Sequence, residues 1–195
     1  MTQEVYSAVD PALYPAGATT GSGGSALSWS AIAAGTVAAI ALTLTLFTLG
    51  SAFGLGSVSP WPGVGAKPTT FTIGAGIWLI VTQWLSAALG GYIAGRMRVR
   101  WQGLHTHEVF FRDTVHGLLT WATATVLMGV VAVGAIALMS LAPAPVDETT
   151  TTEAVDAARK VAATFAAFTG LSLLVGAFIA SVSGAIGGRL RDVHP

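Results

Sequence analysis

The chain has 195 residues, of which 53% are hydrophobic and only 9% are charged, and its mean hydropathy is +0.70. An ordinary soluble domain carries about 25% charged residues, so this composition excludes a water-soluble globule. The sequence contains no cysteine, which excludes disulfides, thiolate metal ligands and cysteine nucleophiles. Because the formal net charge is zero, no overall positive field attracts nucleic acid, and we expect no nucleic-acid partner.

Residues 1–27 form the first segment, which is rich in Ala, Gly, Ser and Thr and whose only charged residues are Glu4 and Asp10. A secretory signal needs a positively charged start, and this segment has no lysine or arginine. Its composition therefore predicts a flexible N-terminal tail.

Four long apolar stretches follow, at about 29–56, 69–95, 114–141 and 161–188. A hydrocarbon core about 30 Å thick needs roughly 20 helical residues, and each stretch reaches that length. Strands of a membrane barrel would alternate polar and apolar residues in segments of about 10, and these stretches do not. We therefore expect an all-α integral membrane protein, with a four-span membrane domain over residues 28–195.

Arginine residues flank these stretches unevenly, and positive residues favour the cytoplasmic side. One group lies between the second and third stretches, and another follows the fourth. This distribution predicts that both termini face the cytoplasm, with the arginines contacting lipid head groups or a partner there. The arginines concerned are Arg96, Arg98, Arg100, Arg112, Arg189 and Arg191.

The ends of the second and fourth stretches are related in sequence. Residues 87–98 align with residues 180–191, and alanine, glycine, isoleucine and arginine recur at matching positions. Since both hairpins would start on the same side, the alignment predicts two tandem parallel helical hairpins related by an axis along the membrane normal.

Glycines in these related segments are spaced four apart, so they share one helix face. Small residues let two helix backbones approach closely in lipid, where hydrophobicity does not drive helices together. The simpler interpretation is contact between helices of one chain, and the alternative is that the same stripes build an oligomer or bind a partner subunit. The predicted packing residues are Gly91, Gly95, Gly170, Ala177, Ser181, Gly184 and Gly188.

The middles of the apolar stretches hold no ionisable residue, which argues against proton-coupled transport. Gln83 is the most polar side chain near the centre of the second stretch, and Thr45 and Thr48 lie in the first. Threonine hydroxyls usually bond to carbonyls of their own helix. A path for a neutral solute lined by these three residues is the alternative.

A polar cluster precedes the third stretch, with His105, His107, Glu108, Arg112 and His116. If a helix begins near Glu108, then Glu108 and Arg112 are neighbours four residues apart. The histidine spacing does not match helical zinc motifs, and hydrolase and nucleotide-binding motifs are absent from the sequence. We expect no metal, no cofactor and no catalytic role, with a metal sensor or enzyme at these residues as a weaker hypothesis.

The segments Phe111–Trp121 and Gly90–Arg96 resemble uncharacterised bacterial membrane proteins that are common in alphaproteobacteria and sometimes labelled PhnA-like. The resemblance covers the four apolar stretches and implies a protein of the bacterial inner membrane, but it transfers no functional residue. From the residues themselves, our leading hypothesis is a non-enzymatic protein that acts by helix packing, as a homo-oligomer or accessory subunit. The alternative is a small channel or facilitator for a neutral solute.

Overall fold

The computed structural model describes residues 26–59, 64–99, 105–141 and 151–193. These residues form four helices: α1 (Trp29–Ser57), α2 (Pro68–Met97), α3 (Thr106–Ser140) and α4 (Thr152–Val193). Each of them is long and apolar enough to cross a membrane. The predicted all-α fold with four transmembrane helices is therefore confirmed, and the chain is a multi-pass membrane protein. The predicted tail lies almost wholly outside the described residues, as does Arg100.

Two helices begin earlier than the apolar stretches that predicted them. The apolar stretches begin at about residues 114 and 161, whereas α3 begins at Thr106, close to the helix start considered near Glu108, and α4 begins at Thr152. The added turns are polar and carry Glu108 in α3 and Glu153 in α4, each in its first turn. Acidic residues near a helix N-terminus interact favourably with the helix dipole, so these turns extend the helices past their apolar segments.

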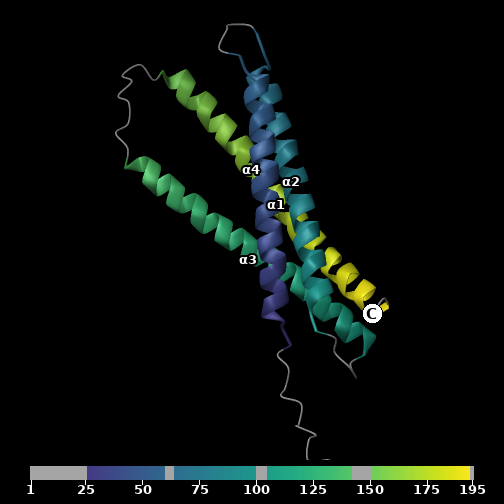
Figure 1. Ribbon diagram of the computed structural model, residues 1–195. Coiled ribbons are helices and arrows are strands. Elements are labelled where there is room, and N and C mark those ends of the chain that lie inside the picture. Colours follow the sequence, from purple (N-terminus) through teal and green to yellow (C-terminus); the bar gives the residue numbers. More distant parts are fainter. Residues whose placement is uncertain (1–25, 60–63, 100–104, 142–150, 194–195) are drawn as a thin grey trace, which may run out of the picture.

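The helices pair as two hairpins, since α1 packs on α2 and α3 packs on α4. The most extensive contact joins α2 to α4, and α3 also touches both α1 and α2. In Figure 1, α1 and α2 run side by side, whereas α3 leaves them at a wide angle toward its C-terminal end.

The core is concentrated at one end of the bundle, where α1 begins and α2 and α4 end. We call this end the base and define it as residues 28–39, 86–98, 113–120 and 180–191; the opposite end is the outer half. Nearly all the fully buried side chains lie in the base. In the outer half, every residue of α3 from Val126 to Ser140 is exposed except Met128, which is half-buried.

The turn between α1 and α2 closes the outer half of the first hairpin. Val58 and Gly65 form an antiparallel β-bridge, and the Ala66 amide donates to the Ser57 carbonyl at 2.9 Å. Gly65 has a φ of +97°, a conformation that a side chain would strain. The outer ends of α1 and α2 are thus held together by the backbone of this turn.

Candidate functional site

The base contains a very close helix contact between α2 and α4. A Cβ atom added to Gly91 would overlap the carbonyl oxygen of Ala180, and one added to Gly95 would overlap that of Gly184. Only glycine therefore fits at these two positions of α2. The predicted stripe does pack, and its contact lies within one chain.

The glycines of α4 also receive α3. A Cβ at Gly184 would lie 2.6 Å from the Asp113 carbonyl oxygen, and one at Gly188 would overlap the Asp113 carboxylate. On α3, a Cβ at Gly117 would overlap the Ala180 carbonyl oxygen. Two stripes with the same sequence pattern thus have different neighbours, because the second one contacts α3 as well as α2.

The upper part of the α4 stripe packs less closely than predicted. A Cβ at Gly170 would meet nothing within 4 Å, so this glycine makes no close contact with another described helix. Ala177 and Ser181 are half-buried, and the Ser181 hydroxyl donates to the Ala177 carbonyl of its own helix at 2.8 Å. Gly170 therefore does not contribute to packing within the described chain, unlike the other glycines of the predicted stripe.

A buried ion pair lies at the centre of the base. Arg98, directly after α2, donates through Nε and Nη2 to the two carboxylate oxygens of Asp113 in α3, and the Nη2–Oδ2 distance is 2.6 Å. Arg98 is 2% exposed and Asp113 is 1% exposed. The prediction that Arg98 contacts lipid head groups is therefore wrong, since a protein carboxylate binds it in a bidentate arrangement inside the bundle.

The repeat-related arginine of α4 has a different role. Arg191 donates through Nη1 to the carbonyl oxygens of Gly95 and Arg98 at 3.2 and 3.0 Å. Its Nη2 donates to Asp192 at 2.6 Å. Carbonyls at a helix C-terminus lack partners within the helix, so Arg191 caps α2 from a neighbouring helix.

His116 connects the start of α1 to the same cluster. Its Nε2 accepts a hydrogen bond from the Ser28 backbone amide at 2.8 Å, and its Nδ1 lies 2.7 Å from the Arg112 carbonyl oxygen. A ring nitrogen that accepts carries no proton, so this geometry corresponds to the neutral ring with its proton on Nδ1. The residues that tie the helix ends together at the base are Ser28, Arg98, Asp113, His116, Arg191 and Asp192, which we call the base cluster.

The remaining predicted arginines lie nearer the surface. Arg112 pairs with Glu108 at 2.7 Å, as their spacing on a helix predicted. Arg96 is half-buried and Arg189 is exposed. Arg100 lies outside the described residues, so its contacts are not assigned.

The sequence did not assign Asp113 to a site, and it suggested His116 only as part of a metal sensor or enzyme. Both residues stand at the mouth of an apolar stretch, and His116 is followed directly by Gly117. An ionisable residue at the edge of a membrane span raises the free energy of the folded protein unless it has a partner. The presence of Asp113 and His116 there was therefore a sign in the sequence that both have partners. Their partners, Arg98 and Ser28, lie 15 and 88 residues away, so spacing along the chain could not reveal them.

The histidines proposed for a metal site are not brought together. His105, His107 and Glu108 are exposed at the start of α3, whereas His116 is buried with both ring nitrogens engaged. Within the described ranges, no group of three His, Asp or Glu residues is arranged to hold a metal ion.

The residues proposed for a polar path also separate. Thr45 and Thr48 are exposed, and their hydroxyls donate to the carbonyls of Ala41 and Leu44 in their own helix. Gln83 instead packs on α4, where a Cβ at Gly176 would lie 2.6 Å from the Gln83 Nε2.

Three buried polar atoms near Gln83 have no hydrogen-bond partner among the described residues. They are Thr82 Oγ1, Ser86 Oγ and Trp121 Nε1. The Trp121 nitrogen lies close to Gln83, because a Cβ at Gly176 would be 2.9 Å from it. Buried polar atoms are normally paired or hydrated, so water would be stabilised between the described helices at this level of the bundle.

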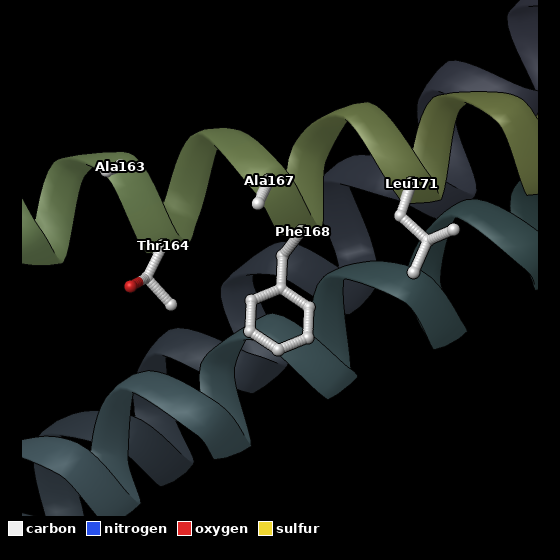
Figure 2. A pocket seen from close by; sticks show the side chains of 5 residues that line it. All are labelled: Ala163, Thr164, Ala167, Phe168 and Leu171. Atoms are coloured by element: carbon white, nitrogen blue, oxygen red, sulfur yellow. The ribbon is translucent and has the colours of Figure 1, made fainter.

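In the outer half, the Phe168 side chain of α4 packs on α2. A Cβ at Gly76 of α2 would lie 2.5 Å from the Phe168 ring. Figure 2 shows Phe168 projecting from α4 toward α2, between Thr164 and Leu171, in a shallow pocket of about 420 Å³. In the outer half, it is therefore mainly α3 that separates from the other helices, while α4 remains in contact with α2.

Comparison with known proteins finds no matching protein-family model, no matching curated protein and no matching solved structure. The functional argument therefore depends on the geometry of this chain.

Proposed function

We propose that this protein acts by helix packing and not by catalysis, as one component of a membrane assembly, either a homo-oligomer or an accessory subunit. The base supports this proposal as a rigid foundation, because glycine contacts and buried polar contacts there position the helices. The outer half of α3 is then the surface on which a neighbouring transmembrane helix binds.

The observation that carries the proposal is the exposure of α3. In the most apolar 18-residue segment of α3 no residue is buried, whereas 28% of the residues in the most apolar segment of α2 are buried. Valines dominate the exposed part, and Val130 and Val133 are 66% and 68% exposed. Packing against other helices stabilises a membrane span, and among the described residues nothing covers α3 from Gly129 to Ser140.

The glycine stripes contribute to assembly indirectly. Replacing Gly91 and Gly184 by leucine should still abolish assembly, because the side chains would separate α2, α3 and α4. The cause would be loss of the base, and the binding surface itself would be unchanged in sequence.

Site-directed cross-linking in native membranes tests the proposal cleanly, because the sequence has no cysteine of its own. Val130→Cys should form cross-linked species in high yield with a reagent that has one thiol-reactive end and one photoreactive end, which also captures a partner without a thiol. A product of twice the chain mass identifies a homo-oligomer, and a product of another mass identifies an accessory subunit.

Ile77→Cys is the matched control, since Ile77 lies at a similar distance from the outer end of α2 and is 54% exposed. Cross-linking at Val130 and Val133 that does not exceed cross-linking at Ile77 would mean that lipid alone surrounds α3, and the proposal would be wrong.

A facilitator for a small neutral solute is the second candidate, and the unpaired buried atoms around Gln83 favour it. Such a path would use Gln83, Thr82, Ser86 and Trp121, without the threonines of α1. Solute flux into liposomes should then fall when Gln83 is replaced by leucine, and equal flux through the wild type and Q83L would exclude this candidate.

Placement in a bacterial inner membrane, with both termini in the cytoplasm, belongs to the same proposal. It depends on the arginine distribution and on the resemblance of residues 90–96 and 111–121. Protease accessibility of the α1–α2 turn in sealed vesicles of known orientation would test it.

A further inference from the structure

An apolar groove of about 710 Å³ lies between the outer halves of α1 and α2 and extends to α4. Aromatic side chains provide much of its wall. They are Phe47, Phe53, Phe71, Trp78 and Phe165. A volume of this size is typical of a ligand site, and the lining favours an apolar ligand.

The polar groups of the groove are already engaged. Trp78 Nε1 donates to the Leu46 carbonyl at 3.0 Å, and the Trp78 ring meets the Phe53 ring edge-on with 6.4 Å between centroids. The hydroxyls of Ser51 and Ser57 donate to carbonyls of their own helix. The groove therefore offers shape and apolar surface to a ligand that needs few hydrogen bonds.

The length of the groove matches one leaflet of a bilayer. Along α1 the lining runs from Phe47 to Ser57, next to the turn. Ten residues at 1.5 Å each extend about 15 Å, which is half of a hydrocarbon core about 30 Å thick. An acyl chain of the leaflet on the side of the α1–α2 turn would fill the groove from end to end.

A positive charge stands where the head group of such a lipid would lie. Ala66 lines the groove, and Lys67 follows it directly and is exposed. Between Gly50 and Leu79 the sequence has no acidic residue, and Lys67 is its only basic one. The rim of the groove is therefore complementary to a phosphate.

We propose that this groove binds an anionic phospholipid of the surrounding bilayer, with an acyl chain against the aromatic side chains and the phosphate beside Lys67. The site is independent of the assembly surface on α3, because no residue of α3 lines it.

The test uses the full chain in vesicles of equal amounts of phosphatidylglycerol and phosphatidylcholine with identical acyl chains. Native mass spectrometry after gentle extraction counts the lipids that stay bound. We expect one retained lipid, with phosphatidylglycerol favoured about fivefold by the charge of one lysine. Equal retention of the two lipids by the wild type would overturn the proposal.

Gly74→Leu blocks the groove with little risk to the fold. Gly74 lines the groove, and a Cβ there would meet nothing within 4 Å. The matched control is Gly170→Leu, which is equally open but lies on α4 and does not line the groove. Lipid retention should fall at least tenfold in G74L and stay unchanged in G170L; equal retention in both would overturn the proposal.

Lys67→Gln and free phosphate separate the head group from the acyl chain. K67Q should retain lipid without preferring phosphatidylglycerol, and a preference as strong as that of the wild type would exclude Lys67 as the phosphate contact. Inorganic phosphate should not displace the bound lipid. If it does, the site recognises phosphate alone and the lipid proposal is wrong.

Discussion

The base and the outer half of this bundle both contain glycines but differ sharply in packing. At the base, glycines at 91, 95 and 184 lie directly on the carbonyl groups of neighbouring helices. In the outer half of α3, Gly129 and Gly134 are just as small, and a Cβ at either would meet nothing within 4 Å. The same residue type thus closes one region and leaves the other open.

What distinguishes the two regions is the polar contact beside each glycine. The base combines its glycines with the Arg98–Asp113 pair, the Arg191 cap and the His116–Ser28 bond. The outer half of α3 has no comparable polar contact with another described helix. Since lipid is as apolar as leucine, hydrophobicity inserts both regions into the membrane but does not join their helices. Close backbone contacts and buried polar partners join the helices of the base.

The largest expected effect comes from breaking the ion pair of the base. Arg98→Ala should lower the free energy of unfolding by about 3–5 kcal/mol, because it leaves the Asp113 charge buried and unpaired. Unfolding in mixed detergent micelles would measure it. Arg112→Ala removes an exposed pair and should cost only about 0.5 kcal/mol; similar losses for both variants would contradict the central role of Asp113.

A smaller effect is expected from adding one methyl group. Gly95→Ala should cost about 1–3 kcal/mol, since the new Cβ would overlap the Gly184 carbonyl oxygen. Gly129→Ala adds the same methyl group in open space and should cost nothing measurable. The same unfolding titration compares them, and equal stability of the two variants would mean that the base is not closely packed.

A still smaller effect should follow from His116→Phe, which removes the acceptor of the Ser28 amide. We expect a loss of about 1–2 kcal/mol from the unpaired amide. Hydrogen exchange of the amides at the start of α1 should become faster, while that of α2 stays slow. His107→Phe is the control, since His107 is exposed, and it should leave exchange in α1 unchanged.

The smallest effect is expected at Thr45 and Thr48. Their hydroxyls are exposed and bonded to their own helix, so replacing both by valine should change stability by no more than about 0.5 kcal/mol. Solute flux in liposomes should also be unchanged, even if Gln83 proves to line a path. Loss of flux in this double variant would support the alternative from the sequence, in which Thr45 and Thr48 line a solute path with Gln83.

The elements that the sequence predicted correctly depend on local properties. The four spans follow from the lengths of apolar runs, and the Glu108–Arg112 pair follows from a spacing of four on one helix. The stripe of Gly91 and Gly95 was predicted for the same reason.

The features that the sequence did not predict depend on where helices meet. Arg98 belonged to a loop rich in arginine, and only the position of Asp113 in the folded bundle distinguishes it from Arg96. Gly170 fits the periodicity of its stripe, but no described helix comes within 4 Å of a Cβ built there. Periodicity along one helix shows which face is small, and it does not show how far the neighbouring helix follows that face.

The Arg191 cap has a consequence for the order in which the protein is built. Its acceptors, the carbonyls of Gly95 and Arg98, are synthesised about 90 residues before it. The carbonyls at the end of α2 therefore lack the Arg191 partner until α4 has been synthesised, although most of the base is made earlier. A chain that stops short of Arg191 would leave the carbonyls of Gly95 and Arg98 without this partner, so the base is complete only once α4 has been made.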